Sequence, residues 1–377
     1  NDRGFPSTPS RPVPRRGRKR AEFESAWIMN RKERLTRCYF NQEIDRPAVY
    51  SRTGFPADDP SYDRLKALLR EATELKAGWW GPQAPPPAES EHRVEPIDAE
   101  WDRRIDILHT PRGPLQQTFR ISRCGQPGMH ETHYLKSLED VDRYLSLPQT
   151  ATTGPVDSFF SAIADLGDAG IVEAGLGLNP AGTVVELMGS EAFALFSVTD
   201  RDRLHALCER ELARHLERLK FLLGHGVGPF FSMLGEEYLV PPLHGERDFY
   251  DFNVRYDKPI VDQIHQAGGR IHIHSHGAIR RVFQGFLDLG ADVLHPFEPP
   301  PQGDLTAAEA KALAQGRLCL EGNLQINRLY EASPAAIREE TRRLIDDAFA
   351  DRKGLIVSPS ASPYIRGLGE QCLPQYE

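Results

Sequence analysis

The sequence predicts an α/β fold, a single (β/α)₈ TIM barrel that carries a helical and antiparallel excursion in its N-terminal half. From Gly170 onward, short apolar strands alternate with helices at roughly 22 to 37 residues per unit, the pattern of a parallel sheet with crossover helices. The chain length of 377 residues suits such a barrel better than a sandwich. Polar or turn-rich motifs follow the strands, and in a barrel these would meet at the C-terminal face, where the sites of this fold are built.

The composition indicates a globular protein with ample core. Hydrophobic residues make up 40% of the chain and charged residues 27%, and no apolar run approaches the ~20 residues that a membrane span needs. The net charge of −8 argues against nucleic acid as a partner and against a strongly polyanionic ligand. Five scattered cysteines, odd in number and without a CxxC pair, indicate a reduced chain in the cytoplasm.

Residues 1–28 are predicted to be a disordered basic extension, because they are rich in Pro, Arg, Ser and Gly. We expect the natural start at Met29 and the barrel domain over residues 29–377. Folding then begins with a helix over 31–40 and a short strand over 48–50. A helix is predicted over 62–77 from the spacing of its leucines.

Residues 94–146 are predicted to form the antiparallel excursion, with strands over 105–108, 115–121 and 130–135 separated by Pro and Gly turns. The remaining elements follow the βα rhythm. Expected strands cover 171–176, 230–234, 271–276, 293–297, 318–320 and 355–357. Expected helices cover 200–223, 257–267, 278–289, 306–314 and 333–350, the fourth opened by a Thr306–Glu309 capping box.

The most informative stretch covers residues 269–277, in which apolar and polar residues alternate between glycines. In a strand, Ile271 and Ile273 would pack under the helices while His272, His274 and His276 face the other side of the sheet. His272 would lie deepest and is expected to be a hydrogen-bonded core residue. Three imidazoles on one face are costly to bury unless they are hydrogen-bonded or metal-bound. The alternatives are therefore an active-site strand and a polar strand end with solvated histidines.

For several other polar residues, a functional role is weighed against a structural one. Glu237, next to Glu236, is the expected general base, and the alternative is an exposed acidic loop. Tyr238 is expected to contact substrate or simply to pack. His295 lies within a strand pattern and is expected to be a hydrogen-bonded core residue. The histidines of the segment His130-Glu131-Thr132-His133 would face opposite sides of a strand, and the segment is not HExxH, so we expect no metal there.

The chain resembles the uroporphyrinogen decarboxylase superfamily, which also contains cobalamin-dependent and coenzyme M methyltransferases. The resemblance lies in residues 30–34, 45–47, 238–242, 249–258, 264–277, 291–300, 321–324 and 356–364. It implies a TIM barrel with its pocket at the C-terminal ends of the strands. The family pattern continues past Tyr376 into a final helix, so the resemblance also implies that the chain is truncated there.

The chain departs from both family branches. True decarboxylases carry an arginine-rich segment after the first strand, whereas residues 51–59 hold one arginine, Arg52, and two acids. Their histidine after the last strand is absent from residues 358–363. A polycarboxylate substrate is therefore disfavoured, and Arg52 is left as the expected contact to a smaller substrate.

The methyltransferase branch carries a zinc motif His-x-Cys-Gly and a further cysteine after the last strand. His274 stands at the first ligand position, His276 replaces the cysteine, and residues 358–363 offer no thiolate. Two histidines at i and i+2 can still chelate one metal with a carboxylate, for which Glu298 is the candidate. The resemblance thus implies a divalent metal, expected to be zinc, at His274, His276 and Glu298.

The function expected from the resemblance is metal-assisted methyl transfer between a small substrate and a corrinoid protein or tetrahydrofolate. The alternative is a cofactor-independent decarboxylase that acts on a porphyrinogen or a smaller carboxylate. A barrel that binds a ligand without catalysis is the third possibility. Metal content separates the first function from the second, and turnover of a methylated corrinoid separates it from the third.

Overall fold

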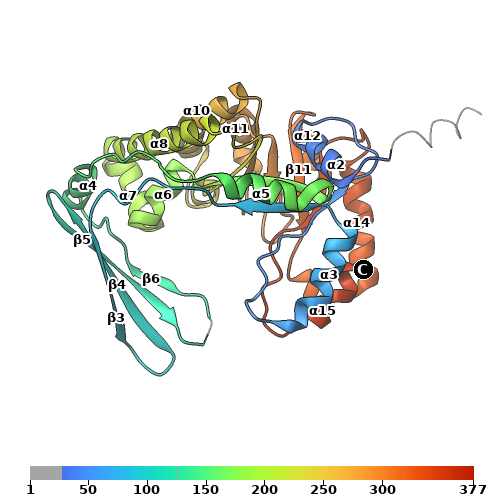
Figure 1. The fold of residues 1–377 in the computed structure, drawn as a ribbon, viewed down its shortest axis with the longest axis horizontal. Coiled ribbons are helices and arrows are strands. Elements are labelled where there is room, and N and C mark those ends of the chain that lie inside the picture. The colour runs from blue at the N-terminus through green and yellow to red at the C-terminus, as the bar shows by residue number, and fades with distance from the viewer. Residues whose placement is uncertain (1–27, 125) are drawn as a thin grey trace, which may run out of the picture.

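The computed structural model describes residues 28–124 and 126–377, and its centre is a parallel eight-stranded sheet (Figure 1). The strands follow the chain order around the sheet, which confirms the predicted barrel topology. They are β1 (Ala48–Val49), β2 (Leu75–Trp79), β7 (Gly170–Leu178), β8 (Phe230–Leu234), β9 (Arg270–His274), β10 (Val293–His295), β11 (Cys319–Leu324) and β12 (Leu355–Pro359). Except for Ile28, the predicted basic extension lies outside the described residues.

The sheet curls so that its first and second strands in chain order, β1 and β2, become neighbours. β1 pairs with β12 on its other side, and no β1–β2 ladder is present among the described residues. Among the described residues, one backbone hydrogen bond of 2.9 Å links them, from the N–H of Glu74, directly before β2, to the carbonyl of Val49 in β1. The junction between β1 and β2 is therefore the weakest seam of the barrel backbone.

The second barrel strand was not predicted. The expected helix over 62–77 ends early, as α3 (Asp63–Ala72), and Thr73 turns to an extended conformation. Leu75–Trp79 then form β2 in parallel register with β7. The five-residue strand is too short to show a period of its own, and its Leu75 continues the leucine spacing of the helix.

Most helices lie near their predicted positions, and Thr306 and Glu309 form the predicted capping box. The helices before β7 are α2 (Arg31–Tyr39), α3, α4 (Leu138–Leu145) and α5 (Asp157–Leu166). Those between β7 and β10 are α6 (Pro180–Met188), α7 (Ser190–Thr199), α8 (Arg201–Gly224), α9 (Glu246–Asp248), α10 (Arg255–Gln266) and α11 (Phe283–Leu289). The last are α12 (Ala307–Ala314), α13 (Arg328–Glu331), α14 (Pro334–Ala348) and α15 (Gly369–Tyr376).

Among residues 28–124 and 126–377, no single helix is long and apolar enough to cross a membrane. In the described part of the chain, one pair of helices taken together, α6 and α7, bent by 108°, meets the length and composition of a span.

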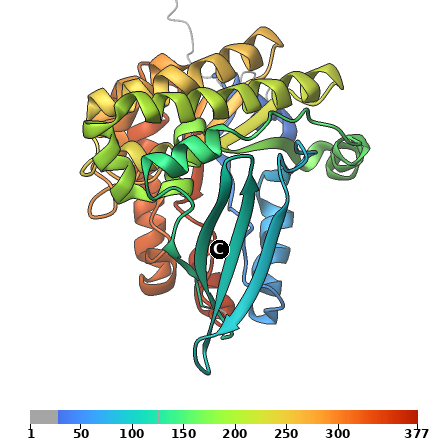
Figure 2. The ribbon, with the colours of Figure 1, turned by 90° about the vertical axis from the view of Figure 1, so that its left-hand side faces the viewer.

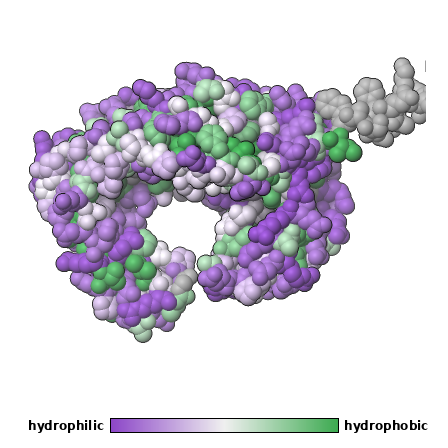
Figure 3. All heavy atoms as spheres, viewed as in Figure 1, coloured by the Kyte–Doolittle hydropathy of each residue, from purple (hydrophilic) through white to green (hydrophobic). Residues whose placement is uncertain are grey.

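The predicted excursion is confirmed and is a separate antiparallel sheet in the order β3-β4-β5-β6 (Figure 2). Its strands are β3 (Ser90–Pro96), β4 (Trp101–Thr110), β5 (Gly113–Ser122) and β6 (Met129–Thr132). The chain enters this sheet after the C-terminal end of β2. Figure 3 shows a hollow between the excursion and the α3–α15 segment.

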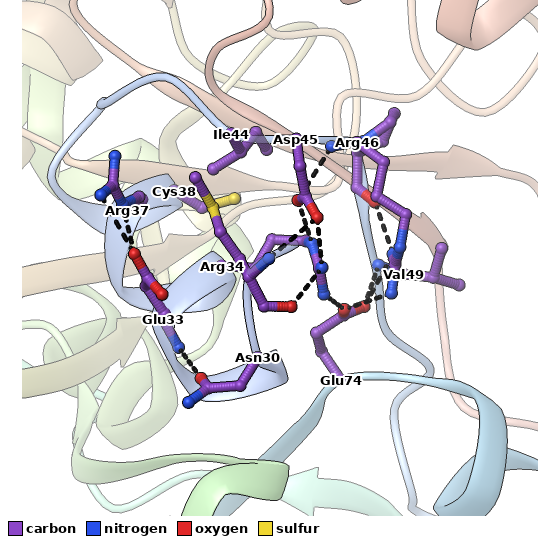
Figure 4. Close-up of polar contacts among 12 residues, drawn as sticks. Asn30, Glu33, Arg34, Arg37, Cys38, Ile44, Asp45, Arg46, Val49 and Glu74 are labelled. Carbon is purple, nitrogen blue, oxygen red and sulfur yellow. Dashed lines mark hydrogen bonds and ion pairs between the residues drawn. The ribbon is translucent and has the colours of Figure 1, made fainter. Parts of the chain in front are cut away.

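A buried charge network holds the N-terminal end of the barrel together (Figure 4). Arg34 donates from Nε and Nη2 to the Asp45 carboxylate, at 2.7 and 2.8 Å, and pairs through Nη1 with Glu74. Glu74 also accepts from the Val49 N–H at 2.6 Å and from Arg46 at 2.8 Å. Since Val49 lies in β1 and Glu74 directly precedes β2, the network bridges the weak seam.

Candidate functional site

A cavity of about 280 Å³ opens at the C-terminal ends of the barrel strands. Its lining combines polar and apolar side chains and comes from strands that are distant in sequence. It comprises Tyr50, Arg52, Thr53, Gly54, Lys76, Gly78, Trp80, Glu173, Ser232, Met233, Leu234, His272, His274, Glu321 and Ser362. The histidine strand β9 thus contributes to the one place where the fold is expected to carry its chemistry.

The two faces of β9 are as the alternation predicted. Ile271 and Ile273 are fully buried and belong to the main core with residues of α10 such as Ile264. His272 and His274 face the cavity instead.

Among the described residues, one group offers three metal-ligating side chains close together. Ligand atoms of His272, His295 and Glu321 all lie within 4.8 Å of one another, and all three residues are buried. The Nε2 atom of His272 has no hydrogen-bond partner and lies 3.7 Å from Glu321 Oε2. A buried imidazole nitrogen without a partner is costly unless it binds a ligand, a water or an ion.

Burial keeps the histidines of this cluster neutral. It lowers the pKa of His272 and of His295 well below the usual range, and positive charge on Lys76 and Arg52 adds to the effect. Burial and Arg52 lower the pKa of His274 to about 2. Neutral imidazole is the form that binds a metal.

The predicted ligands His276 and Glu298 form a pair at the rim. His276 Nδ1 lies 3.0 Å from Glu298 Oε2, and the Gly277 N–H donates to the same oxygen at 3.3 Å. The rings of His274 and His276 are perpendicular, with centroids 4.7 Å apart. His274 therefore stands between the rim pair and the buried group, and it alone of the predicted ligands lines the cavity.

The other predicted site residues are divided between the cavity and its surroundings. Arg52 lines the cavity and has no carboxylate within ion-pair distance among the described residues. Glu237 is half-buried beside the cavity lining, and burial raises its pKa while His276 and Arg52 oppose this shift. Tyr238 does not line the cavity, and its hydroxyl is 3.5 Å from Glu186.

A buried ion-pair network lies within the cavity lining and had not been predicted. Lys76 Nζ is 2.6 Å from Glu321 and 3.7 Å from Glu173, and it lies 4.6 Å from the centre of the Tyr50 ring. Burial opposes its charge, but the two carboxylates raise the pKa of Lys76 above its usual range. Lys76 was hidden within the predicted helix over 62–77, and Glu321 lies inside β11 although the predicted strand ended at residue 320.

The segment His130–His133 differs from expectation. The rings of His130 and His133 stack at 4.5 Å instead of facing opposite sides, because β6 ends at Thr132 and His133 leaves the strand. His130 Nε2 is 2.9 Å from Glu186, and His133 Nδ1 is 3.1 Å from the Glu186 carbonyl. These contacts fix the excursion to α6, away from the cavity.

Glu236 is fully buried, and neither of its carboxyl oxygens has a hydrogen-bond partner. Burial, Asp257 and Glu237, in that order, raise its pKa well above the usual range. Below the unfolded-state pKa of about 4.3, Glu236 is protonated in both states and does not lower the free energy of unfolding. Above that pH, the unfolded chain loses this proton more readily than the folded chain, so the free energy of unfolding falls as the pH rises.

We therefore expect Glu236→Gln to raise the free energy of unfolding on the order of 1 kcal/mol at pH 7.5, and to be neutral near pH 4. Urea melts at the two pH values measure this difference. Glu246→Gln, at an exposed carboxylate, is the control and should match the unmodified chain at both. A Glu236→Gln variant that is less stable at pH 7.5 would contradict the expected protonation.

Comparison with known proteins gives a family match and a shared fold for this chain. Residues 131–364 match the family profile described as uroporphyrinogen decarboxylase (URO-D). A methyltransferase from Methanosarcina mazei shares the fold with a TM-score of 0.58 and 13% identity, over 93% of this chain and 98% of the other. A D-psicose 3-epimerase matches at a TM-score of 0.32 and 12% identity, over 58% of this chain and 84% of the other. A search of the curated proteins gives no match.

Proposed function

The chain belongs to the uroporphyrinogen decarboxylase family, and we propose that it is a metal-assisted methyltransferase that moves a methyl group between a small substrate and a corrinoid protein or tetrahydrofolate. The observation that carries the proposal is the set of neutral imidazoles at the barrel mouth. A cofactor-independent reaction has no evident need for His272, His274 and His295 to be buried side by side in neutral form. The likeness to the Methanosarcina mazei methyltransferase is one of fold and agrees with this choice.

The donor set fits a divalent metal such as zinc. Imidazole nitrogens and a carboxylate are zinc ligands, and the partnerless Nε2 atom of His272 marks a buried ligand position. His274 is the proposed common ligand of two possible sets. One set adds His276 and Glu298 at the rim, and the other adds members of the buried group of His272, His295 and Glu321.

When bound, a divalent metal would lower the pKa of a coordinated thiol or water and so supply the nucleophile that accepts the methyl group. The chain's own groups have complementary roles. Glu237, beside the cavity lining, is the proposed acceptor of the proton that the nucleophile loses, because burial raises its pKa above the usual range. Arg52 offers a guanidinium to an anionic group of the substrate, and the exposed ring of Trp80 offers an apolar wall. Tyr238 is proposed to shape the entrance from outside the cavity lining.

The hollow beside the excursion is the proposed docking place of the methyl carrier (Figure 3). Both of its walls follow the C-terminal ends of barrel strands, the excursion after β2 and α15 after β12. A corrinoid held by a partner protein would approach from that side.

Metal analysis of the purified protein and of three single variants tests the proposal. We expect about one zinc per chain in the unmodified protein and none in His274→Ala, since His274 belongs to both ligand sets. His276→Ala and His295→Ala then identify the set, because only a true ligand lowers the metal content. Consumption of methylcobalamin with a thiol acceptor, followed by absorbance, should be lost together with the metal.

Circular dichroism of each variant is the control for folding. Full metal content in a folded His274→Ala variant would contradict the site, and metal-independent loss of carbon dioxide from a carboxylate substrate would favour the second candidate. That candidate, a decarboxylase, is supported by the guanidinium of Arg52, which no carboxylate of the described residues neutralises.

A further inference from the structure

The guanidinium of Arg52 lies at the point where two imidazole rings converge. Arg52 Nη1 is 2.9 Å from His274 Nδ1 and 3.4 Å from His295 Nδ1. The two Nδ1 atoms are themselves 2.9 Å apart, and the rings stack with centroids 5.1 Å apart. Three nitrogens from three strand ends thus meet in one small volume.

The N–H donors and nitrogen lone pairs of Arg52, His274 and His295 cannot all be paired with one another. His295 Nε2 lies 3.1 Å from the Pro359 carbonyl, which can only accept, so Nε2 carries the proton of the neutral ring and Nδ1 presents a lone pair. His274 Nδ1 faces both this lone pair and the guanidinium donor. If His274 Nδ1 carries a proton, its N–H faces the N–H of Arg52, and two donors meet. If His274 Nδ1 carries no proton, its lone pair faces the lone pair of His295 Nδ1 at 2.9 Å.

A metal ion could bind the lone pairs of both Nδ1 atoms, whereas the guanidinium of Arg52 leaves one of these contacts unsatisfied. Two nitrogens that bind one zinc at about 2.0–2.1 Å must lie within about 4.2 Å of each other, and the two Nδ1 atoms satisfy this condition. A guanidinium cannot lose its proton, so it and a metal ion would repel each other at this position.

We propose that Arg52 is a displaceable cation that competes with the metal for His274 and His295, and that metal binding releases it to bind an anionic group of the substrate. This inference rests on the proposed function and adds His295 as a ligand. Release breaks no ion pair, because Arg52 has none with the described residues, and the cavity of about 280 Å³ borders the side chain. Metal and anion should then bind cooperatively, each raising the affinity for the other by the same factor.

Titration of the full chain with Co²⁺, followed by its visible absorption, measures the competition. We expect Arg52→Gln to bind Co²⁺ about tenfold more tightly than the unmodified protein, because a repelling charge at the site is removed. Arg52→Lys retains the charge and should stay close to the unmodified protein. Arg281→Gln, at an exposed arginine, changes the net charge equally and should leave the affinity unchanged.

Acetate is the probe for release. In the unmodified protein, acetate should tighten Co²⁺ binding, and Arg52→Gln should lose this effect, whereas acetate bound to the metal alone would act equally on both. If the unmodified protein and His274→Ala bind Co²⁺ equally or not at all, the proposed function fails. If binding depends on His274 but Arg52→Gln binds no more tightly, the competition is disproved and the metal site stands.

Discussion

Lys76→Met is expected to lower the free energy of unfolding by about 3–5 kcal/mol at pH 7.5, although methionine is more hydrophobic than lysine. Lys76 and Glu321 are both almost inaccessible to solvent, with 2% and 1% of their side chains exposed. Removal of the cation leaves Glu321 and Glu173 as buried charges without a counter-ion. The cost of an unpaired buried charge exceeds the gain from an added apolar group.

The dependence on pH separates this cause from a packing defect. Without Lys76, burial raises the pKa of Glu321 in the folded chain. A raised folded-state pKa means that stability falls as the pH rises, so the variant should recover part of the loss between pH 7.5 and pH 5.

The double variant Lys76→Met/Glu321→Gln is the matched control. It should be more stable than Lys76→Met alone, because one of the two unpaired carboxylates is gone. Urea denaturation at both pH values provides the measurement. A Lys76→Met variant with unchanged stability would show that the network is hydrated in solution.

The barrel could be predicted because most of its strands and helices carry their own local signals. β8 shows an apolar run and β9 an alternation of apolar and polar residues, each between glycines, and Thr306 with Glu309 begins α12 with a recognisable cap. β2 carries no such signal, since only its pairing with β7 makes five residues a strand. Tertiary pairing, which is invisible in the local sequence, decided that element.

The candidate site could be predicted in most detail along one strand, and the expected neighbour of His276 from the next strand, Glu298, lies 3.0 Å from it. Alternation within β9 placed His272 and His274 on the cavity side, because successive side chains of a strand point to opposite faces of the sheet. The partners of these residues depend on register between strands. Glu321, His295 and Arg52 come from β11, β10 and the loop after β1, and no local pattern indicates that they converge.

The depth of His272 was predicted, but its role was not. We expected a hydrogen-bonded core residue, and the residue is buried, yet its Nε2 atom lacks a partner and faces Glu321. His295 agrees with its predicted place in the core through the bond to the Pro359 carbonyl. Its other nitrogen is directed at His274, which the strand pattern alone does not reveal.

Arg34→Met should be the second strongly destabilising change, with a loss of about 3–5 kcal/mol. The guanidinium of Arg34 is buried and binds Asp45 through two nitrogens and Glu74 through a third (Figure 4). It also donates to the Met29 carbonyl at 2.7 Å. Its removal breaks all four bonds of the guanidinium. Among the described residues, the β1–β2 seam then keeps the backbone hydrogen bond from Glu74 to Val49 and the bonds of the Glu74 carboxylate to Val49 and Arg46. Chemical denaturation gives the loss, and Arg64→Ala, in an exposed pair with Glu370, should change stability by no more than about 1 kcal/mol.

Acid titration identifies the charge pair as the cause. Burial opposes the ionised form of Asp45, but Arg34 and the Met29 N–H lower the pKa of this carboxyl to about 2. A lowered folded-state pKa gives stability that is complete above the unfolded pKa of about 3.9 and is lost as the pH falls toward 2. The unmodified protein should therefore lose stability more steeply between pH 4 and pH 2 than Arg34→Met, in which Asp45 has lost its guanidinium. Equal slopes in this window would mean that the seam depends on packing and not on the Arg34–Asp45 pair.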